Sequence, residues 1–193
     1  MKWKRWELAL GIALLTALLF AAPVQMQREL AGKLTRLHVL ANSDSPEDQQ
    51  LKLKVRDAVL LVAAENREPS GNVLAQMQEA AEQTVRQEGY DYPVSVNRGW
   101  YYFDTRVYDT FALPAGQYDS VRVVIGCGRG RNWWCVVYPQ LCAGMCEEEL
   151  KGIAAEAGFN PKEISLICEE HGYIIRFKLA DFWGKIMHRM DTT

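Results

Sequence analysis

The sequence predicts an α+β fold in which an N-terminal signal or anchor helix precedes a single domain. In that domain a mostly antiparallel sheet is packed by two long helices and a C-terminal helix. Short runs rich in β-branched and aromatic residues predict the strands, and longer segments with apolar residues at helical spacing predict the helices. About 165 residues follow the N-terminal segment, enough for one domain with its own core. The net charge of −2 and the lack of a basic stripe argue against nucleic-acid binding.

The N-terminus has the pattern of an export signal. Lys2, Lys4 and Arg5 precede residues 8–24, which contain no charged side chain. This apolar segment is near the lower limit for crossing a membrane, and proline follows Ala21-Ala22, so both cleaved and uncleaved forms stay open. We therefore expect a signal peptide or membrane anchor at 1–24, a polar tether at 25–33 and an exported domain at 34–193.

The first half of the domain is predicted to be a strand followed by two helices. Residues 34–41 alternate as a strand, and Ser45 with Pro46 predicts the start of a helix that reaches about Asn66. Its apolar face comprises Leu51, Val55, Ala58, Val59 and Val62. A second helix is predicted over residues 73–88, with Leu74, Met77, Ala81 and Val85 on one face.

Strands dominate the second half of the prediction. Residues 94–103 form a strand and 104–117 a loop, and a hairpin joins 120–125 to 133–138 through the glycine-rich turn 126–131. A strand after the glycines, where a phosphate loop has a helix, argues against phosphate binding. Alternation places Trp133, Cys135 and Val137 on one face and Trp134, Val136 and Tyr138 on the other. A helix at 147–157, a hairpin of 164–168 with 173–177, and a helix at 179–190 complete the prediction.

The five cysteines indicate disulfides in an exported protein. We expect up to two bridges and one remaining thiol, with the pairing left open. The disulfide candidates are Cys127, Cys135, Cys142 and Cys146. We expect no metal site, since His38, His171 and His188 are not at zinc-ligand spacing, and no cofactor.

Two kinds of site are compatible with the residues. Cys135 with His38 and Asp44 could form a thiol hydrolase, although a disulfide or buried thiol at Cys135 is favoured. Alternatively, polar loop residues beside an aromatic anchor form a binding patch. Its candidate residues are Asn42, Ser43, Asp44, Arg131, Asn132, Trp133 and Trp134.

Three blocks resemble the stage II sporulation protein R family. They are residues 36–58, residues 100–118 with Trp100-Tyr101-Tyr102-Phe103, and residues 130–142 with Gly130-Arg131-Asn132-Trp133-Trp134-Cys135. They occur in order over about 34–142. The chain departs from the family at Gln140, where a second proline is usual, and Cys127 and Cys146 are outside the family pattern.

The resemblance implies a sporulation signalling protein exported into the space between the two membranes of the sporulating cell. Its expected partner is a membrane-embedded aspartic protease that processes the precursor of a mother-cell sigma factor. It would associate with the membrane through its N-terminal segment. The resemblance supplies no catalytic residues, so a protease activator is favoured over an enzyme, and the Cys135 hydrolase stays open as the alternative.

Overall fold

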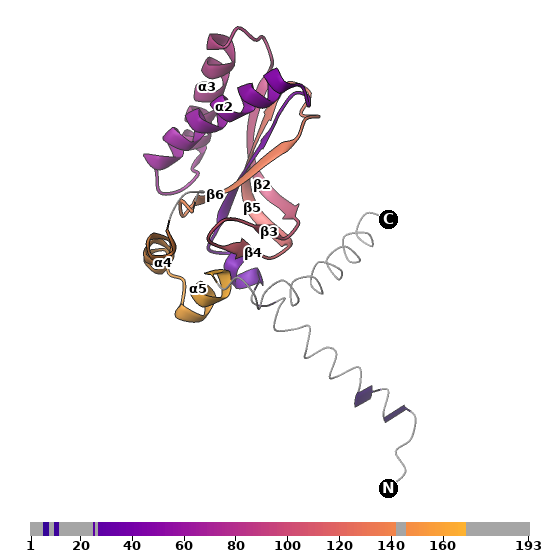
Figure 1. The fold of residues 1–193 in the computed structure, drawn as a ribbon, viewed down its shortest axis with the longest axis vertical. Helices are drawn as coiled ribbons and strands as arrows, with labels where there is room; N and C mark the ends of the chain where they lie inside the picture. Colours follow the sequence, from indigo (N-terminus) through magenta and orange to yellow (C-terminus); the bar gives the residue numbers. More distant parts are fainter. Residues whose placement is uncertain (1–5, 8–9, 12–24, 26, 142–145, 169–193) are drawn as a thin grey trace.

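The computed structural model describes residues 6–7, 10–11, 25, 27–141 and 146–168, and these form an α+β arrangement (Figure 1). Its main sheet has the order β2-β5-β1-β6. The central strand β1 (Thr35–Leu40) runs parallel to β5 (Gly116–Ile125) and antiparallel to β6 (Asn132–Tyr138). At one edge β2 (Val94–Phe103) pairs antiparallel with β5. The sheet is therefore mixed, with one parallel pair among three.

The predicted hairpin between residues 120–125 and 133–138 is wrong. Both segments are strands, but β1 lies between them, so the glycine-rich segment crosses the end of β1 instead of turning back beside β5. The predicted loop at 104–117 also contains the short strands β3 (Arg106–Val107) and β4 (Ala112–Leu113), and β5 begins at Gly116.

The two long helices pack together against one face of the sheet (Figure 1). Helix α2 (Pro46–Ala64) begins where predicted, because the Ser45 hydroxyl accepts a hydrogen bond from the backbone N–H of Asp48 at 3.1 Å. Helix α3 is Gly71–Gln87. Apolar stripes of both helices enclose the inward side chains of the strands in a first core cluster, which includes Leu37, Val39, Val55, Val59, Met77, Ala81, Val121, Val123 and Cys135.

A second core cluster uses the alternate side chains of the strands. Phe103, Tyr118 and Val136 pack there with α4 (Glu147–Glu156) and α5 (Pro161–Cys168). Residues 27–31 are helical, and Leu30 and Ala31 are buried in this cluster, so the C-terminal part of the predicted tether belongs to the domain. The predicted strand at 164–168 is part of α5, and residues 173–177 and 179–190 lie outside the described residues.

The predicted alternation in β6 is confirmed for every predicted residue except Tyr138. Trp133, Cys135 and Val137 belong to the first cluster and Trp134 and Val136 to the second, but Tyr138 also joins the first. A register shift between β1 and β6 at Thr35 and Arg36 places two consecutive β6 residues on one side, as a β-bulge does.

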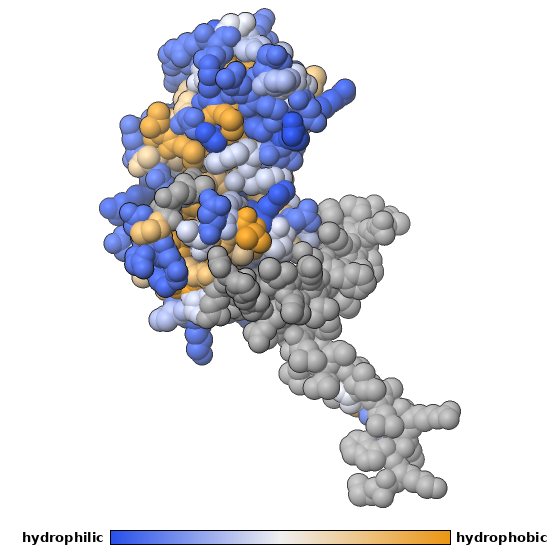
Figure 2. Space-filling model, in the orientation of Figure 1, coloured by the Kyte–Doolittle hydropathy of each residue, from blue (hydrophilic) through white to orange (hydrophobic). Residues whose placement is uncertain are grey.

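The surface over α2 and α3 is mostly hydrophilic, with a few apolar patches (Figure 2). On α2 the exposed large hydrophobic residues are Leu53 and Leu61. Most of the predicted export segment lies outside the described residues. Within the described ranges, no helix combines the length and the apolar character that a membrane crossing requires.

Candidate functional site

Two loops meet at one end of the sheet, and we call residues 41–45 and 126–131 together the loop junction. The first loop leaves β1 and caps α2, and the second carries the chain from β5 to β6 across the end of β1. Four backbone N–H groups of the second loop donate to the first. They join Gly130 to Ala41 O at 2.9 Å, Arg129 to Asn42 O at 3.2 Å, Cys127 to Asn42 Oδ1 at 2.9 Å and Arg131 to Asp44 Oδ1 at 2.6 Å.

Glycine at two positions permits this close approach. A Cβ atom on Gly130 would lie 2.1 Å from the carbonyl oxygen of Ser43, closer than any side chain tolerates. Gly126 has a φ of +58°, and a Cβ atom there would lie 2.3 Å from Asn42 Oδ1. The glycines of this segment therefore allow the two loops to touch.

Asp48 is buried beneath the junction in the first turn of α2. Its carboxylate accepts hydrogen bonds from the Ser43 hydroxyl and from Asn42 Nδ2, the latter at 2.9 Å. Burial alone raises the pKa of Asp48, but hydrogen bonds from Ser43, Asn42 and Tyr92 outweigh it and hold the pKa below its ordinary value. The carboxylate is therefore charged and fixes the first loop on the helix.

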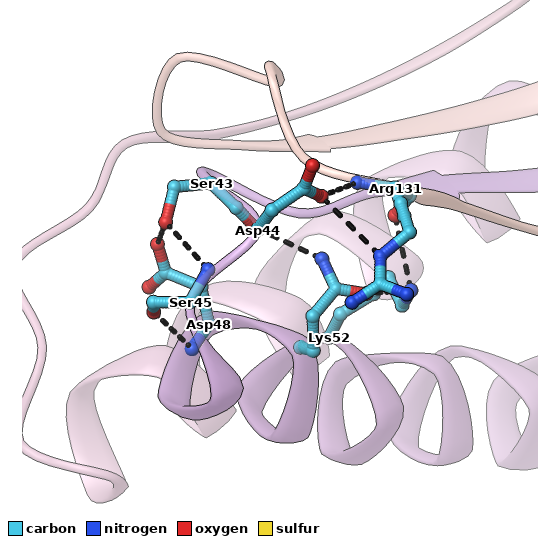
Figure 3. A network of polar contacts seen from close by, with 7 residues as sticks. Ser43, Asp44, Ser45, Asp48, Lys52 and Arg131 are labelled. Atoms are coloured by element: carbon cyan, nitrogen blue, oxygen red, sulfur yellow. Dashed lines mark hydrogen bonds and ion pairs between the residues drawn. The ribbon is translucent and has the colours of Figure 1, made fainter.

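Lys52, one turn further along α2, holds the second loop (Figure 3). Its Nζ donates to Gln49 Oε1 at 2.6 Å and to the backbone carbonyl of Arg131 at 3.0 Å. Burial lowers the pKa of Lys52, and the charge of Arg131 lowers it further, whereas Asp44 opposes the shift. Asp48 and Lys52 were missed by the sequence reasoning, yet they share a helix face with Leu51 and Val55, and this pattern could have indicated their burial.

The upper side of the junction is exposed. Asp44 and Arg131 form an ion pair at 3.6 Å with side-chain exposures of 63% and 75%, and Asn132 beside them is exposed. Trp133 is half-buried, with the guanidinium of Arg56 5.0 Å from its ring centroid. Arg131 therefore lies beside the loop of residues 42–44, and Asn132 and Trp133 follow it on opposite faces of β6.

Trp134 does not belong to this group, because it lies on the opposite face of the sheet. Its ring stacks on His38 with centroids 3.7 Å apart. The two tryptophans thus contribute to different surfaces, and only Trp133 is near the loop junction.

The proposed thiol-hydrolase set is not assembled. Cys135 is disulfide-bonded and buried, so it carries no nucleophilic thiol. In register, Cys135 lies beside Leu37 and Trp134 lies beside His38, which places Cys135 and His38 on opposite faces of the sheet. The alternative of a hydrolase built from Cys135, His38 and Asp44 is therefore wrong.

The other described cysteines differ from the expectation of one remaining thiol, since three of them are free. Cys127 and Cys146 carry free, exposed thiols, so their proposed participation in bridges is wrong, and Cys168 is also free. Cys142 lies outside the described residues. In the part of the chain that the structure describes, no group of three His, Cys, Asp or Glu side chains is placed to hold a metal ion.

A cavity of about 720 Å³ lies near the other end of the sheet. Gly99, Trp100, Asp119 and Tyr138 are among its lining residues. Three of its charged lining side chains are already paired, because Arg98 binds Asp119 with its guanidinium at 2.8 Å and Lys33 binds Glu163 at 2.6 Å. Arg67 and Glu68, which also line the cavity, are exposed.

Both loops of the junction lie within the part of the chain that matches a known protein family. The family model of stage II sporulation protein R matches residues 31–148, more than half of the chain. The chain belongs to the stage II sporulation protein R family. Stage II sporulation protein R of Bacillus subtilis (strain 168) is 38% identical over 117 residues, which cover 55% of this chain and 52% of that protein. The chain thus spans about half the length of the curated relative it matches, and no solved structure matches.

Family membership agrees with the resemblance found in the sequence. The range matched by the stage II sporulation protein R model includes β1, α2, the complete four-stranded sheet and both halves of the loop junction. The chain is accordingly a sporulation protein.

Proposed function

We propose that this chain is an exported sporulation signalling protein that activates a membrane-embedded aspartic protease of the mother cell. That protease processes the precursor of a mother-cell sigma factor. The protein acts by binding, in the space between the two membranes of the sporulating cell, and its N-terminal segment is either an anchor or a cleaved signal. Membership in the stage II sporulation protein R family is the observation that carries the proposal.

The exposed side of the loop junction supports a binding role. Arg131 and Asp44 present opposite charges at the surface, and Trp133 supplies an adjacent aromatic ring. Loops held rigidly by buried contacts are suitable recognition surfaces, since little ordering is required on binding. The buried bonds of Asp48 and Lys52 supply that rigidity here.

A substitution at Arg131 can test recognition without disturbing the stability of the loop junction. Its backbone N–H and carbonyl make the bonds to Asp44 and Lys52, whereas its guanidinium only joins the exposed ion pair. Arg131→Ala therefore removes the recognition group and keeps the junction. Arg86→Ala is a matched control, because Arg86 is exposed on α3 in a similar exposed pair with Glu82.

The test is co-expression of the full chain with the protease and its sigma-factor precursor in a host that does not sporulate. Processing of the precursor should require the chain and should saturate as more chain is supplied. Arg131→Ala should weaken activation by about thirtyfold, the effect of losing a binding hot spot, and Arg86→Ala should not. Equal activation by the unmodified chain, Arg131→Ala and Arg86→Ala would show that the loop junction does not contribute to activation. If an amount of chain far below that of the protease still gave full processing of the precursor, activation by stoichiometric binding would be contradicted.

Export is tested separately. A reporter fused after Thr193 that works only outside the cytoplasm should be active. Replacing Lys2, Lys4 and Arg5 by glutamate should reduce that activity, since the basic residues direct orientation. A reporter that is active only in the cytoplasm would contradict this part of the proposal.

A further inference from the structure

Two arginines on the main sheet and one on the short strand β3 have no carboxylate partner in the described part of the chain. Arg36, Arg106 and Arg122 take part in none of the ion pairs formed among the described residues. We use the name arginine face for the surface formed by Arg36, His38, Tyr101, Arg106, Arg122 and Trp134.

Strand pairing brings this face together. His38 on β1 is in register with Arg122 on β5 and with Trp134 on β6. Side chains opposite one another in neighbouring strands lie on the same side of the sheet. On that side Asn97, the β2 partner of Arg122, is exposed, as is Asn132. Solvent therefore reaches this part of the sheet.

Aromatic rings support the guanidinium groups. The guanidinium carbon of Arg106 is 5.3 Å from the Trp134 ring centroid, and that of Arg122 is 5.6 Å from the Tyr101 ring. Arg36, which is fully buried, lies 4.0 Å from the Phe103 ring. Rings hold a guanidinium flat and leave its N–H edge available for a planar acceptor.

Several buried N–H groups on this face make no hydrogen bond to any residue that the structure describes. They are Nε and Nη1 of Arg36 and Nε of Arg122. Buried polar groups in folded proteins are almost always paired, and a buried charge without a counter-charge is unfavourable. Among the described residues, these guanidinium groups therefore have no counter-charge.

The positive charges of Arg36, Arg106 and Arg122 all act on His38. Burial lowers the pKa of His38 to about 4, and the charges of Arg122, Arg36 and Arg106 each contribute in the same direction. His38 is consequently neutral at physiological pH. The arginines supply the positive potential, which low-dielectric surroundings strengthen.

We propose that the arginine face binds an acidic segment of a partner protein, with Arg122 and Arg106 donating to its carboxylates. Arg36 lies beneath and contributes charge without contact, since it is fully buried. Guanidinium groups match carboxylates in a two-bond, planar geometry, which fits arginines held against rings. The inference goes beyond the proposed function because it defines the chemistry of the partner segment, whichever protein carries it.

An acidic protein segment fits this face better than a membrane surface does. Binding to anionic lipids uses several protruding basic side chains together with apolar residues that insert. Here Arg122, Tyr101 and Trp134 are half-buried against the sheet, and of the three arginines of this face only Arg106 is exposed. A narrow polypeptide reaches such recessed groups, whereas a flat lipid surface does not.

Direct binding of hexaglutamate tests the proposal. Fluorescein-labelled hexaglutamate is titrated with the purified full chain in zwitterionic detergent at low salt, and fluorescence polarisation is recorded. We expect saturable binding that weakens as salt is added, and no binding of hexalysine. Arg122→Gln and Arg106→Gln should each weaken binding about fivefold or more, because each removes a charged donor pair.

Arg86→Gln is the matched control, since it changes the charge equally on α3. It should leave the affinity within about twofold, as expected for an exposed charge away from the site. Circular dichroism establishes that each variant is folded. Should Arg122→Gln unfold because of its packing on Tyr101, the exposed Arg106→Gln still provides the test.

Absence of hexaglutamate binding would overturn the proposal, as would an equal loss of affinity in Arg86→Gln. Sedimentation with phosphatidylglycerol vesicles that depends on Arg122, without hexaglutamate binding, would replace the acidic segment by a lipid surface. The protease takes no part in this experiment. If the chain activates the protease but does not bind hexaglutamate, the inference about an acidic segment is wrong and the proposed function is unaffected.

Discussion

Asp44 and Arg131 are joined through one carboxylate oxygen, Oδ1 of Asp44. It accepts the backbone N–H of Arg131 at 2.6 Å and lies 3.6 Å from the guanidinium Nε. The backbone bond fixes the position of the second loop, whereas the side-chain pair is exposed to solvent. Surface ion pairs contribute little to stability, so the hydrogen bond is the structurally important half of this contact.

Replacing Asp44 by alanine should lower the free energy of unfolding by about 1 kcal/mol, because the N–H of Arg131 loses its acceptor. Asp44→Asn should retain most of the stability, since its amide oxygen still accepts. Urea denaturation of the two variants measures the difference. Asp91→Ala, at another exposed carboxylate, is the control and should change little. An unchanged midpoint in Asp44→Ala would show that the bond is unimportant.

Gly130→Ala should destabilise the protein by about 1–3 kcal/mol, since the added methyl group would overlap the carbonyl oxygen of Ser43. Gly152 lies within α4, where a Cβ atom would meet no other atom within 4 Å, so Gly152→Ala should stabilise by up to about 1 kcal/mol. Thermal unfolding of both variants tests this opposite pair of signs. Two shifts of the same sign would contradict the steric argument.

Ser45→Ala should cost about 1 kcal/mol through loss of the hydrogen bond to the Asp48 N–H. Ser70 occupies the same position before α3 but makes no side-chain capping bond, so Ser70→Ala should have a smaller effect. Denaturation curves of the two variants give the comparison directly. Equal losses would mean that the Ser45 hydroxyl does not cap the helix.

Stability should fall as the pH drops from 6.5 towards 4, because His38 takes up a proton in the unfolded chain but not in the folded one. Burial lowers its folded pKa from 6.5 to about 4, so the folded state binds fewer protons in that window. The loss approaches about 3 kcal/mol at the acid end.

The free energy of unfolding of the parent and of His38→Gln, measured from pH 7 to pH 4, tests this pH dependence. The parent should lose more stability than the variant, and the difference cancels the contributions of His171 and His188. Parallel profiles would exclude His38 as the cause.

The elements with local sequence signals were predicted well. Ser45 and Pro46 define the start of α2 through contacts made within one turn, and β2 was predicted at its observed bounds, Val94–Phe103. The position of β1 was not predictable in this way, because its partners are far away in the sequence. A glycine-rich segment between two apolar runs favours a hairpin. The same segment is also long enough to cross from β5 past β1 to β6, a distance of roughly 10 Å or two strand spacings.

The candidate loop residues were predictable in part, because loop and strand signals in the sequence are local. The bond between Arg131 and Asp44 brings the two loops together, and the strand alternation that the sequence predicts places Trp133 and Trp134 on opposite faces. Asp48 and Lys52 escaped prediction since charged side chains are rarely buried. The partners of Asp48 are Asn42 and Ser43 in the preceding loop, whereas Lys52 depends on the carbonyl of Arg131, which a distant segment supplies.

The central place of β1 has a consequence for the order of assembly. Its two neighbours, Gly116–Ile125 and Asn132–Tyr138, emerge from the ribosome long after Thr35–Leu40 does. Until then the first strand has nothing beside it, and the sheet cannot close on a shorter nascent chain. Pairings between such distant segments form slowly because a long loop must first be closed. A chain built in this order cannot complete its sheet until most of it has been synthesised.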